Sequence, residues 1–62
     1  MDVNAARAEL DLMLDSVSYE LTEARRFGLN DPDRLRRALK RARDHLADAD
    51  ALAGAVVATQ ED

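Results

Sequence analysis

The sequence contains no cysteine and only one histidine, His45. Without cysteine, no disulfide or thiolate metal site can stabilise the fold, and one histidine is too few for the usual Cys/His zinc sites. A chain without cysteine also fits a reducing compartment. We therefore expect a cytoplasmic protein with no metal and no other cofactor.

Long apolar runs are absent as well. The longest one, Ala55–Ala58, is far shorter than the roughly 20 residues that a helix needs to cross a bilayer. The N-terminus opens with Met1 and Asp2 and lacks the basic segment and apolar run of a secretory signal. The sequence therefore predicts a soluble protein that does not contact a membrane.

Glycine, proline and aromatic residues are scarce, with two glycines, one proline and two aromatic residues, Tyr19 and Phe27. Alanine, leucine, arginine and aspartate dominate, and this composition favours helices over strands. The 62 residues allow one small domain. Because a core of this size rarely supplies more than about 3–5 kcal/mol, we expect association to add stability.

The few helix-breaking residues gather in one place, from Gly28 to Pro32. A glycine that adopts the left-handed conformation would end a helix there, and Leu29 would fold back onto Ala24 as the apolar contact of such a cap. Asp31 is suited to accept hydrogen bonds from the free amides of a following helix, and Pro32 suits its first position. This order of residues predicts that one helix ends at Gly28 and that a second helix begins directly after the turn.

Apolar residues recur at intervals of seven and four on both sides of this turn, which is typical of helices that pack on helices. We predict a single all-α hairpin domain over residues 1–62, with helices at about 3–27 and 32–59, a turn at 28–31 and a frayed tail at 60–62. A turn this short makes the helices antiparallel. The thin core predicts that the hairpin assembles into a four-helix bundle or docks on a partner. The predicted helix-packing seam consists of Leu10, Leu14, Val17, Leu21, Leu35, Leu39, Leu46, Leu52 and Val56.

Leu12 and Tyr19 lie seven residues apart and off this seam. Single exposed apolar residues are ordinary on protein surfaces. Two large ones aligned on the outer side of a helix favour a contact with another chain. We take them as a candidate outer interface, with tolerated surface residues as the alternative.

The charges are sorted along the chain. Residues 25–43 hold eight basic residues and two aspartates, a net charge of +6, whereas the rest of the chain holds one arginine and eleven acidic residues, a net charge of −10. In an antiparallel hairpin the basic segment lies at the turn. Cross-helix pairing of Glu20 and Glu23 with this segment would account for the sorting, since flanking charges set orientation in helix bundles.

The basic end is also suited to binding a partner. Arginines fit phosphate geometry, so nucleic acid is one candidate, although the chain is acidic overall and no aromatic residues interleave the arginines. An acidic protein surface is the second candidate. The candidate basic patch consists of Arg34, Arg36, Arg37, Lys40, Arg41 and Arg43.

Catalytic arrangements are not indicated. The pair Asp11 and Asp15, four residues apart, lies on one helical face, but a general acid or base needs a protected pocket, for which two helices have little volume. His45 directly follows Asp44 and so lacks the Glu-x-x-His spacing of bundle metal sites. We expect a small non-enzymatic protein–protein interaction module that forms a homo-oligomer, with a dimer favoured, or binds a larger protein. A nucleic-acid-binding hairpin is the alternative.

Overall fold

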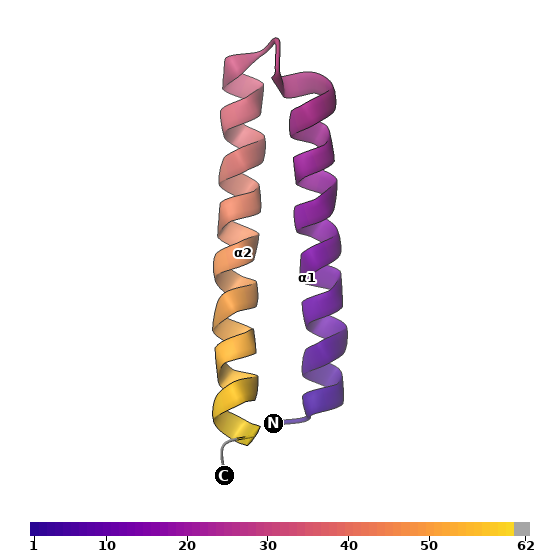
Figure 1. Ribbon diagram of the computed structural model, residues 1–62, viewed down its shortest axis with the longest axis vertical. Coiled ribbons are helices and arrows are strands. Elements are labelled where there is room, and N and C mark those ends of the chain that lie inside the picture. Colours follow the sequence, from indigo (N-terminus) through magenta and orange to yellow (C-terminus); the bar gives the residue numbers. More distant parts are fainter. Residues whose placement is uncertain (61–62) are drawn as a thin grey trace.

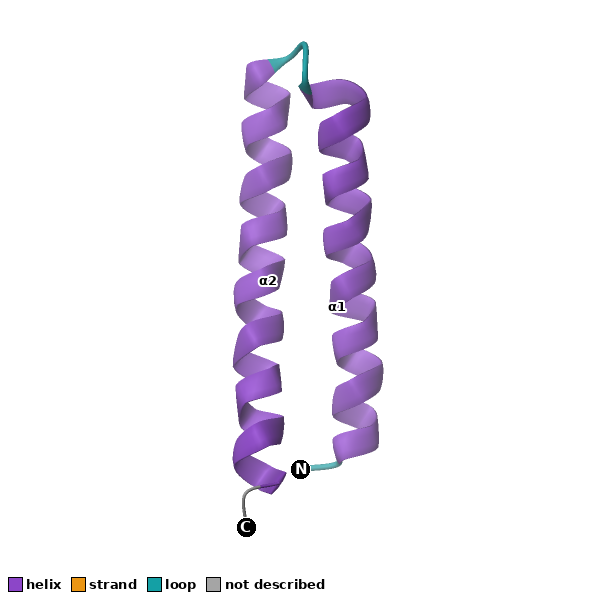
Figure 2. Cartoon of the chain, viewed as in Figure 1, coloured by secondary structure: helices purple, strands orange, loops and turns teal. Residues whose placement is uncertain are grey.

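The computed structural model describes residues 1–60, which form two helices packed side by side. Helix α1 spans Val3–Glu23 and runs into a π-helical turn, η1, at Ala24–Gly28, and helix α2 spans Pro32–Gln60. The helices are antiparallel, so the turn lies at one end of the rod, and the start of α1 and the end of α2 lie at the other (Figure 1). The described residues contain no strand (Figure 2). The predicted all-α hairpin is confirmed.

The second helix begins as the sequence predicts. Pro32 is its first residue, and the Asp31 side chain accepts a hydrogen bond from the amide of Arg34 at 3.2 Å. Asp2 caps α1 in the same way and accepts from the amides of residues 4 and 5. Each aspartate thereby satisfies amides that the first turn of a helix leaves without an intrahelical partner.

The predicted left-handed cap at Gly28 is wrong. No described residue has a positive φ, and Leu29 is 72% exposed rather than folded back onto the helix. Gly28 is buried, and a Cβ atom there would lie 2.9 Å from the Cα of Leu35. The glycine is therefore needed because the end of the first helix touches the backbone of the second, not because the chain needs a positive φ.

The contact between the helices is built mostly from small residues. In α1 most buried and half-buried positions recur at spacings of three and four, at 3, 6, 10, 13, 17, 20 and 23, with position 16 beside them, and the same alternation runs along α2. Small side chains let two helix backbones approach closely but remove little apolar area from water. The buried residues of this seam are Ala6, Val17, Glu20, Ala24, Gly28, Ala38, Ala42 and Ala49.

The hairpin is long and thin, with extents of 49 × 15 × 11 Å. The smallest extent is about the diameter of one helix with its side chains, so this single chain covers neither broad face of the hairpin. Gln60 is helical, and the remainder of the tail predicted at 60–62 lies outside the described residues. Across residues 1–60, neither helix combines the length and apolarity required to cross a membrane.

Candidate interaction surfaces

The nine residues predicted to form the seam fall into two groups. Val17 is buried, and four others are half-buried between the helices, namely Leu10, Leu35, Leu52 and Val56. The remaining four are leucines whose exposed fractions range from 45% to 53%. Each of these leucines directly follows a buried or half-buried residue of the seam, so all four have the same orientation relative to it. These four are Leu14, Leu21, Leu39 and Leu46, and we call them the leucine face.

The leucine face lies on one broad side of the hairpin. A step of one residue turns a helix by 100°, so each of these leucines is rotated away from the seam by the same amount. Because the helices are antiparallel, this rotation leads to the same side of the hairpin on both. The close pairs Glu20 with His45 and Gly28 with Leu35 fix the register. In this register the leucines of the two helices alternate along the rod, in the order Leu14, Leu46, Leu21 and Leu39.

The seam contains a charged residue that the sequence pattern had placed on its flank. Glu20 is only 5% exposed, and its Oε1 contacts Nδ1 of His45 on the other helix. The other oxygen, Oε2, is buried and has no hydrogen-bond partner among the described residues. The signal was the spacing, since Glu20 lies three residues after Val17 and four before Ala24.

Leu12 and Tyr19 are both exposed, at 64% and 68%. By the same helical geometry they lie on the opposite broad side from the leucine face. There they line one wall of a shallow hollow of about 460 Å³ between the helices. The surface predicted as an outer interface is thus accessible, but it carries two large apolar groups whereas the leucine face carries four. The hollow is lined by Leu12, Asp15, Ser16, Tyr19, Glu20, Arg41 and His45.

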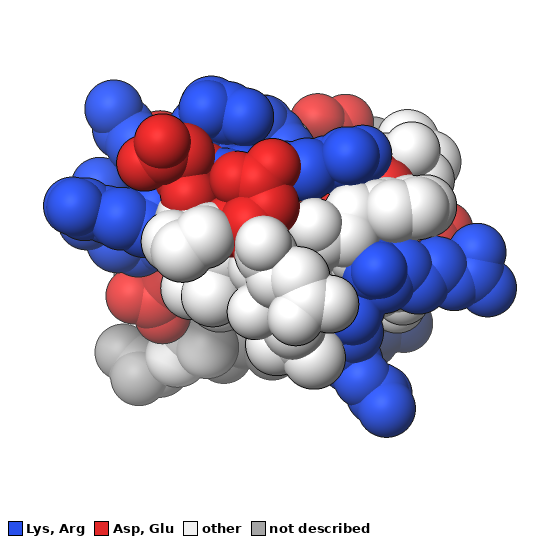
Figure 3. Space-filling view, turned by 90° about the horizontal axis from the view of Figure 1, so that it is seen from above, with Lys and Arg blue, Asp and Glu red and all other residues white. Residues whose placement is uncertain are grey.

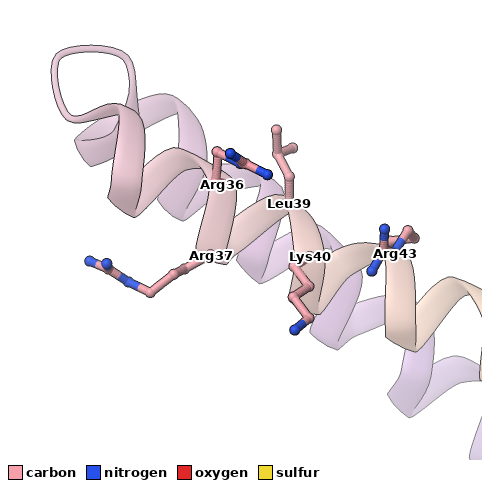
Figure 4. A pocket seen from close by; sticks show the side chains of 5 residues that line it. All are labelled: Arg36, Arg37, Leu39, Lys40 and Arg43. Carbon is pink, nitrogen blue, oxygen red and sulfur yellow. The ribbon is translucent and has the colours of Figure 1, made fainter.

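The basic residues surround the turn end of the rod. Seen from above the turn, Lys and Arg side chains project on several sides of an uncharged centre (Figure 3). On α2 they border an open depression of about 540 Å³ around Leu39. Arg36 and Arg43 project on the same side as Leu39, while Arg37 and Lys40 project on another (Figure 4). The candidate basic patch is therefore divided among three sides of α2, with Arg36 and Arg43 on the side of the leucine face, Arg37 and Lys40 on another side, and Arg41 at the hollow beside Tyr19.

Few of these cations are neutralised within the hairpin. Glu23 pairs with Arg34 at 3.6 Å, and that guanidinium also lies 4.5 Å from the centre of the Phe27 ring. Arg43 pairs with Asp44 at 3.7 Å. Of the pairings considered from the sequence between the two glutamates and the basic segment 25–43, Glu23 with Arg34 is the one that occurs among residues 1–60, and neither glutamate pairs with Arg36, Arg37 or Lys40. The described residues include no ion pair to these three cations.

No group of three or more potential ligand side chains converges on a metal position within residues 1–60. No protein-family model, curated protein or solved structure matches the chain. The proposed function therefore rests on the surfaces of the hairpin.

Proposed function

We propose that this chain is a small non-enzymatic protein–protein interaction module that self-associates through the leucine face. The observation that carries the proposal is the half-exposure of four leucines, gathered on one side of a hairpin that is a single helix thick. Contiguous apolar surface of this kind usually marks an interface. A chain without cysteine fits a reducing compartment, and we propose the cytoplasm.

The expected strength of this association is modest. Covering a leucine that is already half-buried contributes on the order of 1 kcal/mol, and a dimer holds eight such side chains. The entropy lost on association opposes this by about 4–15 kcal/mol. The two quantities are comparable, so we expect the dimer to dissociate on dilution, and helix content to fall with it because the hairpin seam is thin.

The test measures molar mass by light scattering and helix content by circular dichroism across a dilution series. We expect the native chain to be a dimer and Leu14→Glu to be a monomer at the same concentration. Leu29→Glu is the matched control, because Leu29 is an exposed leucine in the turn, off the leucine face. It should remain a dimer.

Leu12→Glu in α1 distinguishes the two apolar surfaces, because Leu12 is exposed and lies only two residues from Leu14. Under the proposal, this variant stays dimeric. If Leu12→Glu or Tyr19→Asp abolished the dimer while Leu14→Glu left it intact, the interface would be the opposite side. A well-folded native monomer at high concentration would overturn self-association altogether.

A second candidate function is nucleic-acid binding by the outer side of α2. The supporting observation is that Arg37 and Lys40 project away from Leu39 and have no ion-pair partner among the described residues, so dimerisation would leave them accessible. Binding of a labelled DNA duplex should then weaken steeply with salt, and Arg37→Glu with Arg41→Glu should abolish it while the helix content is kept. No binding at low salt would exclude this function.

A further inference from the structure

We infer that two copies of this hairpin pack face to face with their turns at opposite ends. The inference rests on the proposed self-association and adds the orientation of the partner. It comes from the charges beside the leucine face, which are arranged symmetrically in sequence about position 18 on the first helix and position 43 on the second.

A closed dimer that buries one face of each copy has a twofold axis lying in the interface. If the axis runs parallel to the helices, both turns lie at the same end and α1 of each copy packs on α2 of the other. If the axis is perpendicular to the helices, the turns lie at opposite ends, and each helix packs on its own counterpart. The leucines allow both arrangements, because they occupy matching positions on the two helices.

The perpendicular axis fits the leucine spacing. Leu14 and Leu21 are placed evenly about residues 17–18 of α1, and Leu39 and Leu46 are placed evenly about residues 42–43 of α2. The contacts of Gly28 with Leu35 and of Glu20 with His45 set residues 17–18 level with about residues 45–48 of α2, so the two midpoints differ by three to five residues, or about 4–8 Å at 1.5 Å per residue. One axis midway between the two midpoints brings Leu14 of each copy near Leu21 of the other. The same axis brings Leu39 of each copy near Leu46 of the other.

The flanking charges follow the same symmetry. Asp11 and Arg25 lie seven residues on either side of position 18, and Arg36 and Asp50 lie seven residues on either side of position 43. At 100° per residue, all four are rotated about 20–80° further from the seam than the leucines, which places them at the edges of the leucine face. With turns at opposite ends, each Arg25 lies beside Asp11 of the other copy. Each Arg36 likewise lies beside Asp50 of the other copy. Four interchain ion pairs then frame eight leucines.

The parallel axis gives the opposite result. It sets Arg25 beside the other copy's Arg36 and Asp11 beside its Asp50, so like charges meet at both ends. The distribution of charge along the whole chain also favours turns at opposite ends, because residues 25–43 carry a net charge of +6 and the remainder −10. One contact opposes the arrangement with turns at opposite ends, since the two copies of Arg43 approach each other at the axis. Its guanidinium is already paired with Asp44 at 3.7 Å, which reduces that repulsion.

The first experiment measures the distance between the two turns. The chain has no cysteine, so Asn30→Cys provides a single site for a spin label in the turn. Turns at opposite ends place the two labels about 30 Å apart along the rod, at 1.5 Å per residue from the axis midway between the two midpoints. Turns at the same end place them much closer, within about 20 Å, because helices in contact lie 8–10 Å apart. A dimer with only the short distance would overturn the inference and leave the proposed function standing, whereas a labelled chain that is monomeric would overturn the proposed function.

The second experiment reverses the charge of one residue and measures whether the dimer dissociation constant rises or falls. Asp11→Arg sets arginine against Arg25 in the opposite-end dimer, and we expect the dimer dissociation constant to rise by about three- to tenfold, in line with the modest worth of exposed ion pairs. In the same-end dimer this change sets arginine against Asp50, and the dissociation constant would fall. Asp15→Arg is the control with the same change in net charge, because Asp15 lies off the leucine face.

Restoring the pair completes the test. The double variant Asp11→Arg with Arg25→Asp should return the dissociation constant to within about twofold of the native value, and the difference between single and double variants should shrink in 1 M salt. If Asp11→Arg tightened the dimer, or if the double variant were weaker than the single one, the opposite-end orientation would be wrong.

Discussion

The carboxylate of Glu20 contacts Nδ1 of His45 across the two helices, at the middle of a seam whose other buried residues are alanine, valine and glycine. The contact marks the register of the hairpin, because it joins the two helices at a single level. The contact also buries a carboxylate, which must be removed from water, whereas a small apolar side chain at this position would carry no such cost. A buried carboxylate depends on its partner more than a surface one does.

Replacing His45 with alanine should destabilise the hairpin. The change removes the partner of a carboxylate that stays buried, so the free energy of unfolding should fall by about 1–3 kcal/mol. Urea denaturation at fixed chain concentration, followed by circular dichroism, measures this. An unchanged midpoint would show that water satisfies Glu20 equally well.

Replacing both partners provides the control for that experiment. With Glu20→Leu and His45→Leu together, no charge is left buried, and such replacements are often neutral or stabilising. We expect the double variant to be at least as stable as the native chain. A large loss in the double variant would mean that packing volume, rather than charge, limits this level of the seam.

Gly28→Ala should weaken the turn end. A Cβ atom at this position would lie 2.9 Å from a backbone carbon of α2, which cannot move aside as a flexible side chain can. Overpacking of this kind typically costs about 1–3 kcal/mol. Thermal denaturation of the variant should show a lower midpoint, and an unchanged midpoint would place the second helix further away.

Gly54→Ala should have the opposite effect, which makes it the matched comparison for Gly28→Ala. Nothing lies within 4 Å of a Cβ atom at position 54, so alanine removes only the helix penalty of glycine. That gain is about 1 kcal/mol in a helix interior. The same thermal scans should therefore show a higher midpoint. A decrease would indicate that another chain packs closely against Gly54.

Asp31→Ala should cost about 1 kcal/mol of stability, because it removes the side-chain acceptor for the amide of Arg34 at the start of α2. Asp31→Asn retains an acceptor oxygen and should restore most of the loss. Urea midpoints of the two variants separate the capping hydrogen bond from the charge. Equal losses in both variants would assign the effect to the charge.

The hairpin itself could be predicted from the sequence. The residues that break helices are confined to Gly28–Pro32, and long stretches of good helix formers flank them, so local preferences alone favour two helices with one turn. Asp31 and Pro32 acted as a start signal because their chemistry is local. Gly28 was misjudged for the opposite reason. Its role depends on the approach of Leu35, which is a tertiary contact.

The side of each helix that faces inward was not determined by the sequence pattern. Leucines recur four residues after the sevenfold repeat, which favoured a seam on that side, whereas the positions at +3 mix Ala38 with the polar Glu20 and His45. In the hairpin the +3 side lies inside, with Ala38 and Glu20 buried, and the leucines at +4 lie at the edge. Close approach of two helices requires small side chains on both, so the choice depended on the opposing helix. By itself the sequence determined two helices, their turn and the sorting of charge. The tertiary structure decided the seam, the burial of Glu20 and the exposure of the leucine face, because each depends on which surfaces meet.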